Sequence, residues 1–439
     1  MCTINNLATE VLQEIFGVTL LLFDEEWEDS WSEKCSMQTT ILSVCRSWRD
    51  ICLAAPSLWT RLRLHLFTRP DLLVLQLGRG KQSRLTITID LLKHEFFGEA
   101  EGRRRVRCRS MAGFLASVLS LLGSSFNRVV ELRIFCTHRT HWPLIAGELS
   151  RFDTGQLTKL LVSLAPGAGR NREPAAVFSP GGAITCLTFS GLGPSGSTQM
   201  YCNLRTLLLG MVLGRSGYTW AALHAVLSAA EKVEVLGLDN VEVVEIDVNV
   251  VAHLPHLTTL MANYGSDTSM DVLGQLHAPS LRTFAVWLHG ADASLARFSA
   301  TATHLLGLTT TFDLSCPLPI EADVRGLLAR LYCAEQLHLR WDAGAALHLM
   351  HSALEGRLLP RLAVLRLLGH ISQEQARLAL LADGGVRRPP MIVVAGEPIF
   401  GSWSSPDFIQ WSMLDGRVVG QVVQCTWDLE WHLHPRLAG

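Results

Sequence analysis

One glycine-rich string is the stretch of this sequence that most resembles a catalytic motif. Gly191 to Gly196 reads GLGPSG, which fits the G-x-G-x-x-G pattern of a dinucleotide-binding loop. That fold needs a helix opening at the loop and a crossover of a dozen or more residues to the next parallel strand. Here Pro194 interrupts the motif, and only STQMYCN separates it from the strand-like unit that begins at Leu204. We therefore expect a tight turn and no nucleotide cofactor.

Two histidine-containing strings, CTHRTHW and EWHLHP, offer the other candidate chemistry. Neither has the paired ligand spacing of a structural zinc site, and no fourth ligand can be named, so we expect ordinary surface or packed histidines. The sequence also lacks G-x-S-x-G, a Walker loop and H-E-x-x-H, the patterns that would nominate catalytic groups. It predicts a protein that is not an enzyme, with no catalytic residues, no metal and no cofactor. The residues in question are Cys136, His138, His141, Glu430, His432 and His434.

The composition indicates a chain that buries one face of most of its elements. Of its 439 residues, 48% are hydrophobic, yet no apolar run reaches the ~18 residues that a membrane span needs. Repeat solenoids have this character, because each unit buries a face against its neighbours. The net charge of −2 implies no general attraction to nucleic acid or to anionic lipid. We expect neither as a partner.

Charge is concentrated in two short runs instead. Residues 23–34 read FDEEWEDSWSEK and are acidic, and residues 102–109 read GRRRVRCR and are basic. We expect both to be solvated loops; nuclear import or an acidic partner is the other interpretation of the basic run. Eleven cysteines without a C-x-x-C pair, and no signal-peptide layout, favour the cytoplasm or the nucleus.

Residues 4–59 carry a helical pattern. INNLATEVLQEIF (4–16) has one apolar stripe at one-turn spacing, and Asn5 or Asn6 would cap its start. Pro56 ends a second predicted helix, because proline lacks an amide proton and disfavours a helical residue before it. The second helix is expected to place six residues on one face: Ile41, Val44, Cys45, Trp48, Ile51 and Cys52.

Beyond residue 60, short strand-like units of the form apolar-x-x-apolar-x-apolar recur. Their period of ~20–29 residues is typical of leucine-rich repeats. Each unit has three inward apolar residues that it cannot bury alone, so we expect the units to stack into a curved parallel sheet. Helices such as 220–230 and 324–334 would cover its convex side. Asn240 and Asn263 are the only plausible survivors of the asparagine that regular repeats place after each strand, so the array is irregular. The units are 129–134, 157–162, 184–189, 204–209, 233–238, 257–262, 281–286, 334–339 and 362–367, with weaker forms at 60–66, 83–91 and 308–314.

The N-terminal segment resembles an F-box. LATEVLQEIF (7–16) followed by LSVCRSWRDICLAAPSLW (42–59) is similar to the family's Leu-Pro-x-Glu-Ile/Val-Leu-x-x-Ile-Phe, Val-Cys-Arg-x-Trp-Arg and Pro-x-Leu-Trp. The fungal type, with its closing Pro-Ser-Leu-Trp, is the nearest form. Ala8 replaces the usual proline, and the acidic run 23–34 lengthens the connection between the helices. These departures leave open a degenerate F-box that no longer binds its partner.

The resemblance implies a function and a set of contact residues. An F-box docks on the small linker subunit of an SCF-type cullin–RING ubiquitin ligase, and a C-terminal domain, often of leucine-rich repeats, captures the substrate. We expect Val11 and Ile15 to serve the core, whereas Trp48, Leu58 and Trp59 suit a core and an interface equally. By this resemblance the linker-binding surface is made or shaped by Leu7, Val11, Leu12, Ile15, Val44, Cys45, Trp48, Leu58 and Trp59.

The outward positions of the repeats are the predicted substrate-binding surface. Side chains alternate along a strand, so residues flanking the fourth position of each unit point to the concave face. They are mixed in charge, which suggests a protein partner without identifying it. The predicted positions are Glu131, Arg133, Lys159, Thr206, Thr259, Thr283, Gln336, His338 and Arg366.

The sequence thus predicts an α/β protein with three parts. These are an α-helical F-box-like domain (1–60), an irregular leucine-rich-repeat solenoid (61–390) and a tryptophan-rich capping segment (391–439), of which MIVVAGEPIF (391–400) is a candidate last strand. We expect a substrate-recognition adaptor of an SCF-type ubiquitin ligase that binds the linker subunit, and through it the cullin, as well as an unknown substrate protein. The alternative is a repeat scaffold outside any ligase, with a degenerate F-box whose helices only cap the first repeat.

Overall fold

The computed structural model forms two compact units, Met1–Ala165 with Ala175–Ile184, and Pro166–Pro174 with Thr185–Gly439. We call them the first and the second unit. The residues that the structure describes are 7–26, 37–64, 68, 70–91, 113, 117–136, 142–164, 183–191, 198–212, 218–264, 267–288, 294–316, 321–340, 359–368, 391–395, 407–414 and 417–424.

The first unit begins with the predicted helices, which differ from the prediction in two respects. Helix α1 (Thr9–Glu26) continues into the acidic run that we expected to be a loop. The single helix predicted over residues 41–52 is wrong, because α2 (Met37–Val44) and α3 (Arg46–Ala54) are separate helices. Cys45 lies between them with φ −157° and ψ 171°, and its Sγ accepts a hydrogen bond from the amide of Trp48 at 3.4 Å. Pro56 opens the 3-10 turn η2 (Pro56–Trp59), as expected of a helix stop. Asn5 and Asn6 lie outside the described residues.

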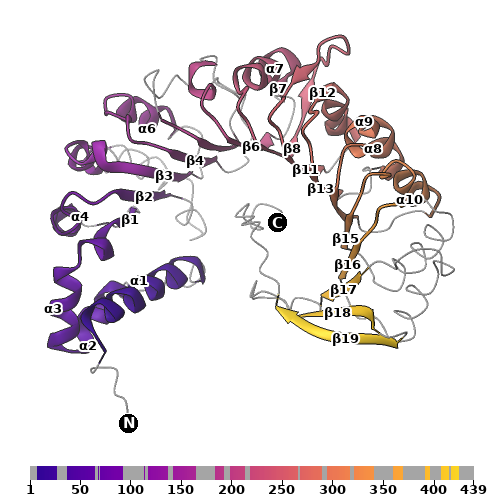
Figure 1. The fold of residues 1–439 in the computed structure, drawn as a ribbon. Coiled ribbons are helices and arrows are strands. Elements are labelled where there is room, and N and C mark those ends of the chain that lie inside the picture. Colours follow the sequence, from indigo (N-terminus) through magenta and orange to yellow (C-terminus); the bar gives the residue numbers. More distant parts are fainter. Residues whose placement is uncertain are drawn as a thin grey trace, which may run out of the picture. The chain divides into compact units, whose positions relative to one another are not determined.

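Four parallel strands complete the first unit. They are β1 (Arg61–Leu64), β2 (Leu85–Asp90), β3 (Val129–Cys136) and β4 (Lys159–Leu164), paired in chain order. Their inward residues form two buried rows. Figure 1 shows α4 (Pro70–Arg79) and α6 (Trp142–Leu149) along one face of these strands; a 3-10 turn, η4 (Phe126–Arg128), leads into β3. The two rows are Leu62, Ile87, Leu132 and Leu160, then Leu64, Ile89, Ile134 and Val162.

The second unit continues the same design. Each strand from β5 to β17 in the series below pairs in parallel with its neighbour, whereas β17–β18 and β18–β19 are antiparallel. The series is β5 (Cys186–Ser190), β6 (Thr206–Val212), β8 (Val235–Val241), β11 (Thr259–Tyr264), β13 (Thr283–Leu288), β14 (Thr311–Ser315), β15 (Gln336–Arg340), β16 (Val364–Leu368), β17 (Met391–Ala395), β18 (Asp407–Leu414) and β19 (Arg417–Gln424).

Helices lie along one face of this sheet as well (Figure 1). The helix predicted at 220–230 is confirmed as α7, whose first turn is capped by Thr219 Oγ1 accepting from the Ala222 amide at 3.3 Å. The helix predicted at 324–334 begins earlier and ends at Leu328, as α10. The other elements are η6 (Thr198–Tyr201), α7 (Trp220–Ala229), η7 (Asp267–Gln275), α8 (Leu295–Thr301), α9 (Thr303–Leu306) and α10 (Glu321–Leu328), with the short pairs β7 (Tyr218–Thr219)–β9 (Val243–Val244) and β10 (Ala252–His253)–β12 (Leu276–His277).

A recurring set of backbone hydrogen bonds explains the period read from the sequence. The amide of Leu257, the first apolar residue of its unit, closes a turn onto Leu254 O at 3.2 Å. The next two amides, of Thr258 and Thr259, both donate to the carbonyl of Glu234, immediately before the preceding strand β8. Equivalent bonds recur at the units that begin at 204, 233, 281, 334 and 362, apart from small differences in length. The prediction of a mixed α/β fold built on a long parallel sheet is confirmed.

Candidate functional site

The catalytic-looking strings do not assemble a chemical site in the part of the chain that the structure describes. Gly191 has φ 74°, and its amide donates to Gly210 O at 2.9 Å, while residues 192–196 lie outside the described part. Cys136 is fully buried on β3, and burial, with the nearby charge of Asp90, raises the pKa of its thiol to about 12. Its string partners at 138 and 141, and those at 430, 432 and 434, are not described. No described group of three or more His, Cys, Asp or Glu side chains is placed to hold a metal ion.

The N-terminal helical segment, residues 7–59, is built around a small apolar core. Phe16 of α1 is 2% exposed, and its ring lies 4.8 Å from that of Trp48 on α3, measured between centroids. Leu7, Leu42, Trp48 and Ile51 are partly buried and pack against this core. Its fully buried members are Leu12, Phe16, Ile41, Cys52, Ala55, Leu58 and Trp59.

Helix α1 also carries a second apolar stripe, which the core does not cover. Val11, Ile15 and Val18 are 45%, 38% and 50% exposed. Because residues four and three apart share one face of a helix, these three side chains lie in line beside the buried Leu12 and Phe16. We call them the α1 stripe. The expectation that Val11 and Ile15 serve the core is wrong.

The break between α2 and α3 determines how exposed the predicted contact residues Val44 and Cys45 are. Val44, the last residue of α2, is 54% exposed rather than buried with Ile41, since the single-helix face on which both were placed does not exist. Cys45 is half-buried and caps α3, as described above. Arg49 Nε donates to the carbonyl of Leu42 at 2.9 Å, which holds the two helices together.

Leu58 and Trp59, for which core and interface were both open, are buried within the chain. Leu58 is 8% and Trp59 4% exposed. The indole Nε1 of Trp59 donates to Cys52 O at 2.8 Å, and the guanidinium carbon of Arg79 on α4 lies 4.5 Å from the indole centroid. These two residues, together with Leu12, therefore lie in the core beneath the predicted linker-binding surface and do not form part of its exposed area.

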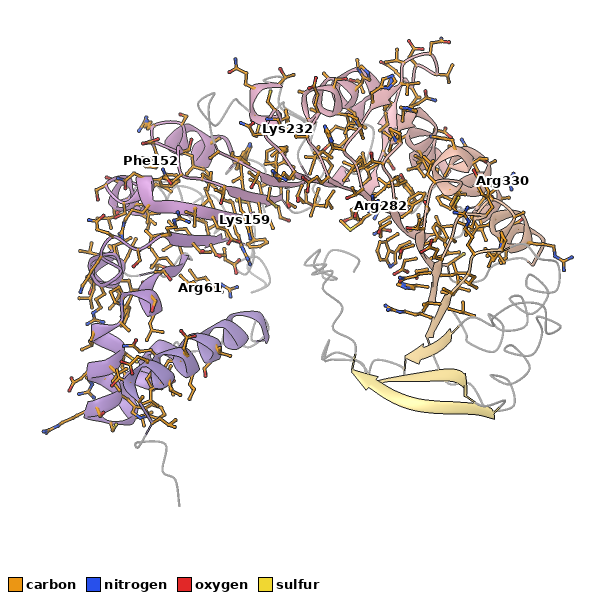
Figure 2. The ribbon with its side chains drawn as sticks, viewed as in Figure 1. Arg61, Phe152, Lys159, Lys232, Arg282 and Arg330 are labelled. Atoms are coloured by element: carbon orange, nitrogen blue, oxygen red, sulfur yellow. The ribbon has the colours of Figure 1, made fainter. Side chains whose placement is uncertain are left out.

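The face of each sheet opposite its helices, here called the open face, presents the predicted substrate-binding positions. In the first unit one row across the strands consists of Arg61, Thr86, Glu131 and Lys159. Arg61 and Lys159 are exposed and Glu131 is half-buried. Figure 2 labels Arg61 and Lys159 at the two ends of this row.

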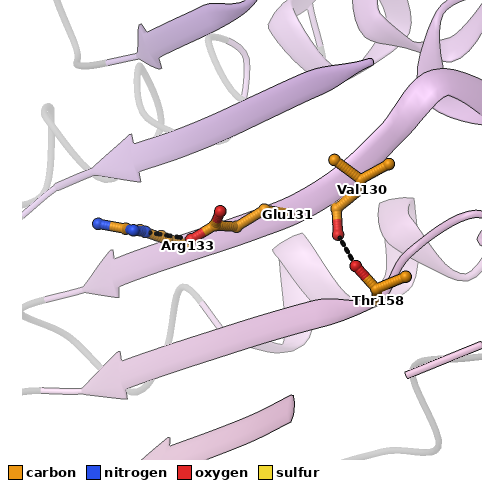
Figure 3. Close-up of polar contacts among 4 residues, drawn as sticks. All are labelled: Val130, Glu131, Arg133 and Thr158. Atoms are coloured by element: carbon orange, nitrogen blue, oxygen red, sulfur yellow. Dashed lines mark hydrogen bonds and ion pairs between the residues drawn. The ribbon is translucent and has the colours of Figure 1, made fainter. Parts of the chain in front are cut away.

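Arginines on the same face neutralise its carboxylates. Arg133 Nε donates to Glu131 Oε1 at 2.7 Å (Figure 3). Arg63 donates to Asp90 Oδ2 at 2.8 Å, and Asp90 is only 6% exposed. Arg61, Arg63 and Asp90 were not among the predicted site residues, although their positions in the weak units 60–66 and 83–91 could have pointed to them.

The same row in the second unit is neutral. It contains the predicted Thr206, Thr259, Thr283 and Gln336, all half-buried. The register places them in one row that runs Thr206, Val235, Thr259, Thr283, Thr311 and Gln336, so that Val235 and Thr311 lie between the predicted positions. The alternation of side chains was therefore predicted correctly in this row.

The neighbouring row of the second unit contains a largely buried polar cluster. Asp313, His338 and Arg366 lie next to one another on β14, β15 and β16. His338 is 7% and Asp313 5% exposed, with His338 Nδ1 3.8 Å from Asp313 Oδ2. The prediction that His338 is an outward contact residue is thus wrong in its exposure, because side chains on adjacent strands cover it. Arg366 is half-buried.

A second polar pair on the open face was also missed. Asn263 Nδ2 donates to Asp239 Oδ1 at 2.6 Å, across β11 and β8. Asn263 is therefore an open-face residue and not a turn asparagine after its strand. Asn240 has a left-handed backbone conformation, with φ 48°, but it lies within β8 and not after it. Trp287, half-buried on β13, lies next to Asn263 in the register.

In comparisons with known proteins, no family model and no curated protein matches the chain. In the part of the chain that the structure describes, no helix combines the length and apolar character needed to cross a membrane.

Proposed function

We propose that this protein is a substrate-recognition adaptor of an SCF-type cullin–RING ubiquitin ligase. The N-terminal helical segment acts as an F-box and binds the linker subunit, and the strand units form an irregular leucine-rich-repeat solenoid whose open face binds the substrate protein. The adaptor itself carries out no chemistry. It accelerates transfer by holding the substrate near the charged ubiquitin carrier, since fixing two reactants together removes much of the entropic barrier.

The α1 stripe is the observation that carries this proposal. A helix that closes a small core needs one apolar face, yet α1 has Leu12 and Phe16 in the core and Val11, Ile15 and Val18 exposed beside them. Exposed apolar side chains that are contiguous mark interaction surfaces. The stripe coincides with Val11 and Ile15 of the F-box-like sequence pattern, which supports docking rather than accidental exposure.

The recurring backbone hydrogen bonds support the repeat assignment. The strand units that begin at 204, 233, 257, 281, 334 and 362 enter the sheet by a turn closed at the first apolar residue, followed by two amides that share one carbonyl immediately before the preceding strand. Each such unit bonds to the units before and after it, as repeats in a solenoid do. The open face then offers one continuous row of outward positions within each unit for a protein ligand.

Capture of the linker subunit by the full chain tests the proposal. Val11→Glu with Ile15→Glu places two charges in an apolar interface without touching the core, so the dissociation constant should rise by roughly a hundredfold or more. Val248→Glu, at a site that is 72% exposed in the second unit, is the matched control and should bind normally. Failure of the unsubstituted chain to bind the linker subunit at micromolar concentration would overturn the proposal. Leu58→Ala is less suitable, because Leu58 is buried.

A repeat scaffold outside any ligase is the second candidate, and one contact favours it. Arg79 of α4 stacks on Trp59, so the helical segment packs against the first strand–helix pair as a cap would. On this hypothesis the glutamate substitutions in the α1 stripe leave every partner interaction of the chain unchanged. A linker subunit that binds the unsubstituted chain and loses affinity for the double variant decides against the scaffold.

A further inference from the structure

Two cations on the open face of the first unit are left without an acidic partner. Arg61 begins β1 and Lys159 begins β4, and both side chains are exposed. Neither forms an ion pair or a side-chain hydrogen bond with another described residue. They occupy the two ends of the row that runs Arg61, Thr86, Glu131, Lys159.

The carboxylates of this face are already engaged. Glu131 is held by Arg133 and Asp90 by Arg63, each at less than 3 Å. The described part of the face therefore has four cationic side chains and two carboxylates, which leaves an excess of two positive charges at Arg61 and Lys159. Because the paired arginines are fixed on their own carboxylates, the excess is localised at the ends of one row.

The second unit shows that this charge is not a general property of the repeats. Its equivalent row contains no charged side chain from Thr206 to Gln336. Its other open-face groups include Asp239 and Asp313 as well as Arg366. A negatively charged ligand is therefore expected to bind the open face of the first unit in preference to that of the second.

We propose that the open face of the first unit binds an extended acidic segment of the substrate protein. This deepens the proposed function by giving the chemistry of the segment recognised, and it rests on that function. Neighbouring strands lie about 4.8 Å apart, so three intervals separate Arg61 from Lys159 by roughly 14 Å. An extended chain rises about 3.3 Å per residue, so two carboxylates four residues apart reach both cations. Thr86 and the pair Glu131–Arg133 lie between them and face the middle of the segment.

Peptide binding to the full chain tests this inference. The probe is a fluorescein-labelled unstructured peptide with two glutamates four residues apart, and its binding is followed by fluorescence anisotropy. Arg61→Glu with Lys159→Glu should weaken binding about tenfold, which corresponds to about 1.4 kcal/mol, because exposed charge pairs contribute modestly and are screened by salt. Lys232→Glu makes the same change at an exposed site between α7 and β8 (Figure 2) and should leave binding unchanged.

The outcomes separate this inference from its rivals. A peptide with glutamine in place of both glutamates should lose affinity to the same degree as the double variant. Equal binding of both peptides, or equal binding by the double variant, overturns the inference, as does tighter binding of a single-stranded oligonucleotide that displaces the peptide from the same residues. Thermal unfolding of each variant checks that the exposed substitutions leave the fold intact. The two proposals fail separately when the unsubstituted chain is tested. Failure to bind the peptide together with intact capture of the linker subunit refutes this inference alone, and peptide binding without capture of the linker subunit refutes only the ligase function.

Discussion

The indole nitrogen of Trp59 donates a hydrogen bond to the carbonyl oxygen of Cys52 at 2.8 Å. Cys52 lies near the end of α3, and Trp59 closes the η2 turn that leads into β1. The face of the same indole ring meets the Arg79 guanidinium of α4. One buried side chain thus connects the core of the helical segment with the first strand–helix pair of the first unit.

Two substitutions of Trp59 should separate the contribution of its ring to the free energy of unfolding from that of its hydrogen bond. Trp59→Phe keeps an aromatic ring beneath Arg79, so the free energy of unfolding should fall by about 1–2 kcal/mol, the magnitude of one lost buried hydrogen bond. Trp59→Ala also opens a cavity in the core and should cost about 3–5 kcal/mol. Urea denaturation measures both. Equal losses in the two variants would show that the ring contributes nothing to the junction.

The strands of the sheet were predictable because they depend on a local pattern. Apolar residues at the fourth and sixth positions of each unit, such as Leu260 and Ala262, point inward, and neighbouring units must stack to bury them. Except at β3, which begins at Val129 as predicted, the starts of the nine main strand units were set two residues too early. The first apolar residue, Leu257 for example, closes the preceding turn instead of joining the ladder, which periodicity alone does not reveal.

The helical segment was less predictable because exposure depends on what covers each side chain. Val11 and Leu12 are adjacent and equally apolar, and only the packing of α1 against η2 and α3 exposes one and buries the other. The break at Cys45 arises from an extended backbone that the amphipathic pattern of residues 41–52 does not record. On the open face, His338 had the right direction but not the right exposure, because that depends on Asp313 from another strand.

Truncation of the buried and of the exposed apolar side chains of α1 should change the free energy of unfolding by very different amounts. Leu12→Ala removes a side chain that is 3% exposed and should lower the free energy of unfolding by about 2–5 kcal/mol. Val11→Ala removes one that is 45% exposed and should change it by no more than about 0.5 kcal/mol, as is usual for surface positions. Urea denaturation of the two variants provides the comparison. A loss above 2 kcal/mol for Val11→Ala would mean that the α1 stripe is covered by the chain itself.

The thiol cap of α3 can be improved or removed by single substitutions. Cys45 Sγ accepts from the Trp48 amide at 3.4 Å, but a thiol sulfur is a weak acceptor. Cys45→Ser supplies a hydroxyl, a preferred cap, and should raise the free energy of unfolding by about 0.5 kcal/mol, whereas Cys45→Ala should lower it by about 0.5–1 kcal/mol. Urea midpoints at neutral pH should therefore rank serine above cysteine above alanine. An alanine variant as stable as the serine variant would show that the cap has no energetic role.

The buried thiol of Cys136 should make the first unit sensitive to alkaline pH. Burial, followed by the charge of Asp90, raises its pKa in the folded state to about 12, from an ordinary value of 9.0. The folded state therefore favours the protonated thiol. The resulting stability is fully present below pH 9 and is lost as the pH rises from 9 toward 12, by at most about 1.4 kcal/mol per pH unit.

Replacing the thiol isolates this contribution from other groups that titrate in the same range. Burial also raises the pKa values of Tyr218 and Tyr264, so the unsubstituted chain loses stability above pH 9 for more than one reason. Cys136→Ala cannot titrate at this site, so its free energy of unfolding, although lower at pH 8 because of the cavity, should fall less steeply between pH 9 and 10.5. Urea denaturation at several pH values gives both slopes. Identical slopes would mean that Cys136 ionises in the folded state as readily as in the unfolded chain, against its complete burial on β3.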